Sequence, residues 1–171
     1  MKKIFLGIMS LALGGCLGIP QSVVPVKAFD LDKYLGKWYE IARLDHSFER
    51  GLEQVSAEYS LLKGGGIQVK NSGFSVEKNK WRTAVGKAFF IRESNEGYLK
   101  VSFFGPFYGS YIVFELDQEN YQHAFICGPN TSYLWFLSRT PEVDEKLMAQ
   151  FIEKARDLGF ETDKLIYVNH L

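Results

Sequence analysis

Cysteine and histidine are scarce in this chain of 171 residues, which has two cysteines and three histidines. The histidines lie in unrelated segments, with no cysteine or carboxylate at the spacing that metal ligands require, so we expect no metal site and no cofactor. Cys16 belongs to the export signal described below, which leaves Cys127 without a partner for an internal disulfide. Stability must therefore come from an apolar core and from strand pairing.

Net charge and membrane-spanning apolar runs are lacking as well. Twenty basic residues balance twenty acidic ones, and neither sign is clustered. The sequence thus lacks the basic face of a nucleic-acid-binding protein, and we expect no nucleic-acid partner. The apolar stretch over residues 4–13 has about half of the roughly 20 residues that a membrane-spanning helix needs. It is too short to be a stable transmembrane anchor.

The start of the chain has the pattern of an export signal instead. Lys2 and Lys3 precede the apolar stretch, and two glycines follow it. The sequence Leu-Gly-Gly-Cys that ends at Cys16 resembles the bacterial lipobox, in which the chain is cut before the cysteine and the thiol receives lipid. This resemblance implies a lipoprotein signal peptide over residues 1–15 and membrane attachment through lipidated Cys16, which two or more acyl chains make stable. A plain secretory signal cut elsewhere is the alternative.

Residues 16–28 are expected to be a lipidated tether. Pro20 and Pro25 stand among residues with neither helical nor alternating periodicity, and such a segment reaches at most about 40 Å when extended. Leu17, rather than an aspartate, follows Cys16, which resembles the sorting context for the outer membrane.

From residue 29 onward the chain is one domain of short runs rich in aromatic and β-branched residues, separated by turn signals. We expect strands at residues 37–45, 54–62, 66–76, 80–92, 97–104, 109–117, 121–128 and 132–139. Eight closely spaced strands predict an all-β fold, an up-and-down antiparallel barrel or a sandwich.

One helix is predicted after these strands. Thr140 can cap it, Pro141 suits its first turn, and apolar residues recur at helical spacing up to Leu158. Gly159 ends it, and residues 165–168 form a short final strand. The single apolar stripe indicates that the helix packs against the outside of the sheet.

No catalytic group emerges from the sequence. Cys127 and His123 lie four residues apart in one expected strand, about 13 Å from each other, which is too far for a nucleophile and its base. His46 or His170 could approach Cys127 only through the fold.

Several motifs resemble the lipocalin family. The Gly-x-Trp sequence at residues 36–38 is similar to the opening signature of that family, and Arg139 is similar to its last-strand arginine. Residues 39–43, 46–52 and 100–109 resemble the bacterial outer-membrane lipoprotein branch. The resemblance implies an eight-stranded up-and-down barrel over residues 29–171, with one C-terminal helix outside it. It also implies lipid anchoring in the outer membrane of a Gram-negative bacterium, on the periplasmic face.

The resemblance assigns roles to both ends of the barrel. Trp38 closes the base, with Gly36 beside it and the Arg139 guanidinium stacked on its ring as a cation–π pair. Residues 45–53 resemble a lid over the cavity mouth, where Phe48 and Arg50 would suit the tail and the anionic head of an amphiphile. An ordinary surface loop is the alternative for this segment.

One face of each strand is expected to line the cavity, since eight strands leave room for one small ligand or for packed side chains. The candidate wall residues are Ala42, Leu44, Tyr59, Val69, Ala88, Phe90, Val101, Phe103, Ile112, Phe114, Leu134 and Phe136. Both faces of these strands are partly apolar, so the register of each strand is open.

Three functions are compatible with this sequence. The first is binding of a fatty acid, lysophospholipid or similar amphiphile for envelope lipid transport, storage or maintenance. The second is a lipid- or isoprenoid-modifying enzyme, for which Cys127 is the candidate nucleophile. The third is a structural envelope lipoprotein whose barrel is filled by its own side chains. The sequence leaves the oligomeric state open, with a homodimer as one alternative.

Overall fold

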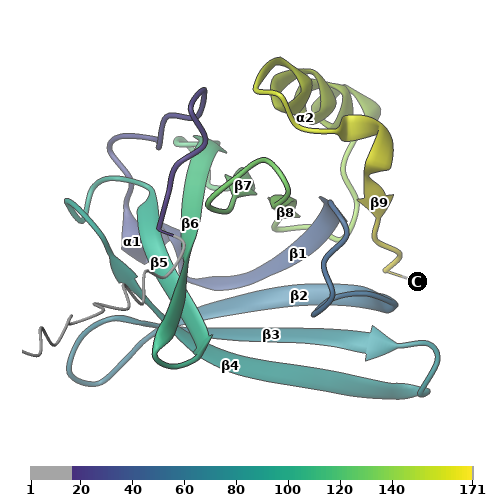
Figure 1. Ribbon diagram of the computed structural model, residues 1–171, viewed down its shortest axis with the longest axis horizontal. Coiled ribbons are helices and arrows are strands. Elements are labelled where there is room, and N and C mark those ends of the chain that lie inside the picture. Colours follow the sequence, from purple (N-terminus) through teal and green to yellow (C-terminus); the bar gives the residue numbers. More distant parts are fainter. Residues whose placement is uncertain (1–16, 171) are drawn as a thin grey trace, which may run out of the picture.

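The computed structural model describes residues 17–170, which form a β-barrel with a helix against one side (Figure 1). The predicted signal peptide and the lipidation site at Cys16 lie outside the described residues.

Eight antiparallel strands form the barrel, and each boundary lies within two residues of the sequence prediction. The sheet order is β2-β3-β4-β5-β6-β7-β8-β1, and β1 also pairs with β2, which closes the barrel. The predicted eight-stranded up-and-down barrel is therefore confirmed. The strands are β1 (Gly36–Arg43), β2 (Leu52–Leu61), β3 (Ile67–Ser75), β4 (Lys80–Phe90), β5 (Tyr98–Phe104), β6 (Phe107–Leu116), β7 (His123–Cys127) and β8 (Leu134–Ser138).

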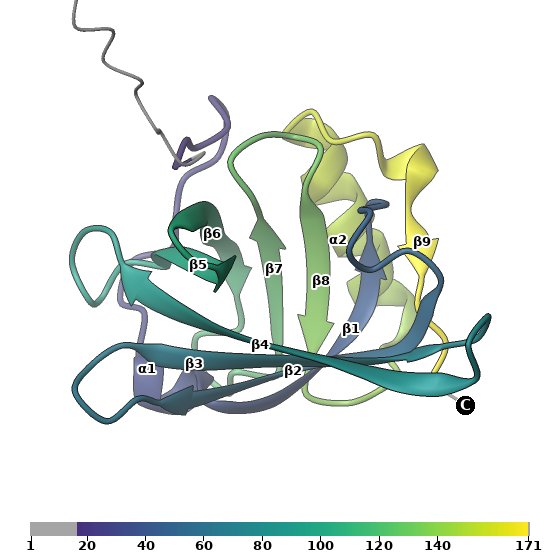
Figure 2. The same cartoon turned by 60° about the horizontal axis from the view of Figure 1, so that its bottom comes forward.

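The up-and-down order places alternate connections at opposite ends of the barrel (Figure 2). We call one end the closed end; there the β2–β3, β4–β5 and β6–β7 connections meet the short helix α1 (Leu31–Tyr34). The sequence analysis missed α1, because four residues are too few for a helical pattern to show. We call the other end the open end. Its connections are residues 44–51, 76–79, 105–106 and 128–133.

The ladder between β4 and β5 is short. Only residues 87–90 of β4 pair with β5, whereas the β3–β4 ladder runs from residue 80 to residue 88. In the described part of the chain, residues 80–86 thus have a paired strand on one side only. The long β3–β4 hairpin extends beyond β5 for this reason (Figure 2).

Helix α2 (Glu145–Asp157) packs outside the barrel, as predicted, but it begins later than expected. The side chain of Asp144, and not that of Thr140, caps it by accepting a 2.7 Å hydrogen bond from the Leu147 N–H. The Thr140 hydroxyl is used instead in the preceding turn, where it donates to the Glu142 carbonyl. Gly159 ends the helix with a φ of +88°, a conformation that favours glycine.

The chain then returns to the barrel through a 3₁₀ turn, η1 (Thr162–Lys164), and a two-residue strand. This strand, β9 (Ile166–Tyr167), pairs with the end of β1, in agreement with the predicted final strand.

Residues 17–28 are not the free tether that their composition suggested. Val23 is buried, and the Val26 N–H donates a 2.9 Å hydrogen bond to the Val113 carbonyl. Near the other end of the segment, the Ser110 hydroxyl donates to the Gly18 carbonyl at 2.7 Å. Isolated buried valines without periodicity leave no pattern in the sequence, so this packing could not be predicted.

Candidate functional site

The base of the barrel is built around Trp38 and Arg139. The guanidinium carbon of Arg139 lies 3.9 Å from the centroid of the Trp38 ring, which is the stacked arrangement that the resemblance implies. Arg139 also donates hydrogen bonds of 2.8–2.9 Å to the backbone carbonyls of Lys33, Leu35 and Lys37. One side chain thus holds the α1 segment, the start of β1 and the end of β8 together.

Gly36 makes room for this arrangement. Its φ is +93°, and a Cβ atom there would lie 3.4 Å from the nearer guanidinium nitrogen of Arg139. The Trp38 indole N–H donates a 2.8 Å hydrogen bond to the Tyr34 carbonyl, which satisfies its polar atom inside the closed end. These residues close the barrel and leave ligand chemistry to the rest of the interior.

A small apolar cavity lies above this base, between α1 and the inner faces of β2 to β6. Its volume is about 10 Å³, room for about one water molecule. The lining residues are Phe29, Leu31, Tyr34, Tyr59, Ile67, Val69, Ala88, Leu99, Val101 and Tyr111.

Three tyrosine hydroxyls supply the polar side-chain atoms of this wall. Tyr111 lies between the other two, with O···O distances of 2.7 Å to Tyr34 and to Tyr59. Burial raises the pKa of each phenol, so all three are neutral at physiological pH. A chain of neutral hydroxyls can both donate and accept hydrogen bonds in an otherwise apolar site.

The structure places six of the twelve expected wall residues inside the barrel. Tyr59, Val69, Ala88 and Val101 line the cavity itself. Phe90 and Phe103 are partly buried and pack against the same inner cluster.

The other six were assigned to the wrong face. Ala42, Leu44, Ile112, Phe114, Leu134 and Phe136 lie in an outer cluster together with Phe151 and Ala155 of α2. The rings of Phe136 and Phe151 are 4.9 Å apart, for example. Two causes combine here: α2 makes the outer face of these strands apolar too, and bulges in β1 and β6 shift the alternation.

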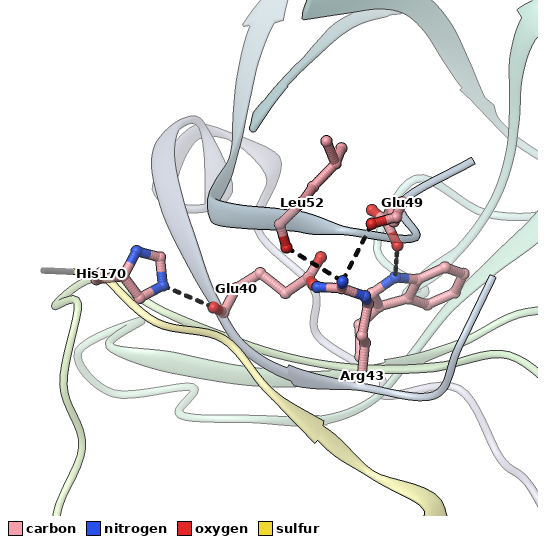
Figure 3. Close-up of polar contacts among 6 residues, drawn as sticks. Glu40, Arg43, Glu49, Leu52 and His170 are labelled. Carbon is pink, nitrogen blue, oxygen red and sulfur yellow. Dashed lines mark hydrogen bonds and ion pairs between the residues drawn. The ribbon is translucent and has the colours of Figure 1, made fainter. Parts of the chain in front are cut away.

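A charged group that the sequence analysis did not identify lies inside the open end (Figure 3). We call Glu40, Arg43 and Glu49 the mouth cluster; all three are buried. Arg43 Nη1 donates to Glu40 Oε1 at 2.7 Å, and Arg43 Nη2 donates to the carbonyls of Glu49 and Leu52 at 3.1 and 3.2 Å. Trp135 Nε1 donates to Glu49 Oε2 at 3.0 Å. The mouth cluster shows in the sequence only as charged residues within and after an aromatic-rich first strand. Charged residues in a strand normally indicate a face that points outward.

Burial dominates the electrostatics of the mouth cluster. It raises the pKa of Glu40 well above the usual range, and repulsion from Glu49 adds to this, whereas Arg43 opposes it. Burial also raises the pKa of Glu49, against the hydrogen bond from Trp135. One guanidinium balances one carboxylate, so protonation of the second carboxyl group is favoured. Among residues 17–170, the Arg43 Nε–H has no hydrogen-bond partner.

The expected lid, residues 45–53, covers this cluster. Phe48 is exposed and stacks on His46, with ring centroids 5.1 Å apart, and His46 stacks in turn on Tyr133. Arg50 points into solvent and forms a salt bridge with Asp45. Arg43, rather than Arg50, is therefore the cation that faces the barrel interior.

Cys127 does not face the cavity. It lies fully buried in the outer cluster, and burial raises the pKa of its thiol to about 12. A protonated thiol on the far side of the sheet cannot attack a ligand in the barrel.

Among residues 17–170, no three of His, Cys, Asp and Glu converge as metal ligands would. Neither helix in that part of the chain is long and apolar enough to cross a membrane.

Comparison with known proteins identifies the family. Residues 29–170 match the lipocalin-like domain. The outer membrane lipoprotein Blc of Vibrio cholerae is 62% identical over 168 residues, with 98% of each chain covered. The protein of the same name from Escherichia coli K12 is 49% identical over 149 residues, with 87% of this chain and 84% of that protein covered.

The solved structures agree on the fold. Insecticyanin from the tobacco hornworm superposes with a TM-score of 0.70 at 22% identity, covering 89% of this chain and 86% of that chain. The insecticyanin structure thus shares the barrel, and the two bacterial relatives are named outer membrane lipoproteins. The chain belongs to the lipocalin family, in its bacterial outer-membrane lipoprotein branch.

Proposed function

We propose that this protein is lipid-anchored through Cys16 on the periplasmic face of the outer membrane. There it holds a fatty acid, a lysophospholipid or a similar amphiphile in the barrel, for transport, storage or maintenance of envelope lipids. Support for the location comes from the lipobox-like sequence and from the outer membrane lipoproteins to which the chain is similar.

The observation that carries the binding proposal is the chemistry of the barrel interior. Apolar side chains such as Val69, Ala88 and Val101 line the part of the interior near the closed end, which suits an acyl chain. The part near the open end holds the mouth cluster, where the unpartnered Arg43 Nε–H suits an anionic or hydroxylated head group. An apolar interior with a few polar groups is the usual composition of a ligand site.

The wall must move for such a ligand to fit. Ligand sites commonly have volumes of about 300–1,000 Å³, far above the 10 Å³ of this cavity. Phe90 and Phe103 are partly buried inner residues, and their side chains are the ones that we expect to rotate aside. Binding should therefore be coupled to rotation of these two side chains, on β4 and β5.

The small cavity also favours a second function, that of a structural lipoprotein with a filled barrel. An enzyme has less support, since its candidate nucleophile, Cys127, lies on the outer side of the sheet.

Native mass spectrometry of the full lipidated chain, purified from its own host and challenged with palmitate and with lysophosphatidylethanolamine, tests these alternatives. We expect one bound amphiphile, which is lost in Ala88→Leu because the larger side chain fills the cavity. Val85→Leu is the matched control, since Val85 is exposed on the same strand.

A third variant keeps the result interpretable if Ala88→Leu does not fold. Val69→Ala enlarges the cavity and should accept longer acyl chains. Absence of any bound amphiphile in the unmodified protein and in Val69→Ala would support the filled barrel. Conversion of the added lipid to a product would establish an enzyme.

A further inference from the structure

Large apolar side chains are exposed at the open end of the barrel. They are Phe48, Val76, Trp81, Phe104 and Phe107, and each leaves 54–80% of its surface exposed. They come from three separate segments: the β1–β2 connection, the β3–β4 hairpin and the β5–β6 hairpin. Single exposed apolar residues are ordinary, but several on successive connections at one end indicate an interaction surface. We call these five residues the apolar rim.

Exposed basic residues lie beside the apolar rim. Beside the apolar rim, the β3–β4 hairpin carries Lys78, Lys80 and Arg82 against Glu77, all exposed. The other exposed charges of the open-end connections, Asp45 and Arg50, neutralise each other. At the closed end the exposed charges nearly balance: Asp30, Asp32, Glu93 and Glu119, against Lys27, Lys33, Lys37, Lys63 and Arg92. The basic residues of the β3–β4 hairpin lie directly beside the apolar rim, where they suit contact with an anionic surface.

The N-terminal segment shows where the lipid anchor leaves the protein. A Cβ atom on Gly18 would lie 3.2 Å from the carbonyl oxygen of Pro129, in the β7–β8 connection of the open end. The Ser110 hydroxyl and the Tyr98 hydroxyl donate to the carbonyls of Gly18 and Leu17, respectively. Residues 17 and 18, where the described part of the chain begins, are thus held beside the open end.

We propose that the apolar rim docks onto the phospholipid leaflet that holds the anchor, so that the mouth of the barrel faces anionic lipid. The proposal rests on the lipidation of Cys16 in the proposed function and adds the orientation of the barrel on the membrane. An amphiphile leaving this leaflet would then enter the barrel without crossing water. The apolar rim supplies the contact with acyl chains, and Lys78, Lys80 and Arg82 attract the head groups.

Fluorescence quenching by brominated phospholipids measures the predicted contact. The full lipidated chain is reconstituted into vesicles of phosphatidylethanolamine and phosphatidylglycerol, with bromine on the acyl chains. Trp81 is exposed on the apolar rim, whereas Trp38 and Trp135 face the barrel interior. We expect quenching that is lost in Trp81→Phe and strongly reduced in Phe104→Glu/Phe107→Glu. Leu61→Glu, a change at an exposed leucine next to the closed end, is the matched control and should leave the quenching unchanged.

Two results would overturn the docking proposal while leaving amphiphile binding intact. One is unquenched Trp81 in a protein that floats with the vesicles and still takes up palmitate. The other is cross-linking between copies through Phe107→Cys, with Trp81 unquenched, which would make the apolar rim an interface between two copies of the chain. Failure of the unmodified protein to float with vesicles would instead contradict lipidation of Cys16, on which both proposals depend.

Discussion

Trp135 on the last barrel strand holds Glu49 in the connection between the first two strands, through a hydrogen bond of 3.0 Å. This contact crosses the mouth of the barrel and attaches the expected lid to the wall. Arg43 supplies a second attachment, through the carbonyls of Glu49 and Leu52. The lid is thus fixed by side chains from two neighbouring strands.

Trp135→Phe should loosen this lid. The ring remains, but the hydrogen bond to the Glu49 carboxyl group is lost, at a cost of about 1 kcal/mol or more in the free energy of unfolding. Hydrogen exchange of residues 45–51 measures the local effect and should become faster. Tyr133→Phe is the control, because it keeps the aromatic stack on His46. Equal exchange in both variants would contradict the attachment.

Glu40→Gln should change the pH dependence of stability. The folded protein raises the pKa of Glu40 above the ordinary value of 4.5, so it binds the proton more tightly than the unfolded chain does. Stability is therefore lost as the pH rises above 4.5 towards the folded-state pKa. A glutamine cannot ionise, so the loss between pH 5 and pH 8 should be smaller in the variant.

Urea unfolding at pH 5 and pH 8 measures this difference. Glu153→Gln, an exposed change on α2, is the control and should show the same loss as the unmodified protein. An unchanged loss in Glu40→Gln would show that Glu40 does not carry the proton.

Arg139→Lys should destabilise the closed end although it keeps the positive charge. A lysine ammonium cannot stack flat on Trp38 and reach the carbonyls of Lys33, Leu35 and Lys37 together. We expect a loss of about 2 kcal/mol in the free energy of unfolding. Urea unfolding tests this, with Arg156→Lys on α2 as the control, and an equal midpoint for the two variants would rule out a special role for Arg139.

Asp144→Ala and Thr140→Ala distinguish the two candidate caps of α2. Asp144 accepts a hydrogen bond from the Leu147 N–H, so its loss should cost about 1 kcal/mol. Thr140→Ala should cost less, because Thr140 bonds only within the preceding turn. Thermal unfolding followed by circular dichroism compares the two variants. A larger effect of Thr140→Ala would identify Thr140 as the cap of α2, as the sequence predicted.

The strands could be predicted because turn residues, such as the glycines at 64–66, separate short runs of aromatic and β-branched residues, which are typical of strands. The base could be predicted because the Gly-x-Trp sequence at residues 36–38 and Arg139 resemble signatures of the lipocalin family. The inner face could not, since the outer face of β6 to β8 and β1 is covered by α2 and is equally apolar. When both faces of a strand are apolar, the alternation of polar and apolar residues does not show which side chains face the barrel interior.

The mouth cluster escaped prediction for a different reason. Buried charges are rare, so Glu40 and Arg43 within a strand indicate an outward face to any pattern-based argument. The irregularity in β1 between Glu40 and Ala42 puts both side chains on the inner face, where they pair at 2.7 Å.

The one-sided pairing of residues 80–86 has a consequence for how the protein behaves at high concentration. An unpaired strand margin is a template onto which a strand of another molecule can add, and this leads to aggregation or fibres. Here the exposed margin carries Lys80 and Arg82. Positive charges of this kind repel an identical neighbour, so the barrel can keep part of one strand unpaired without assembling into polymers.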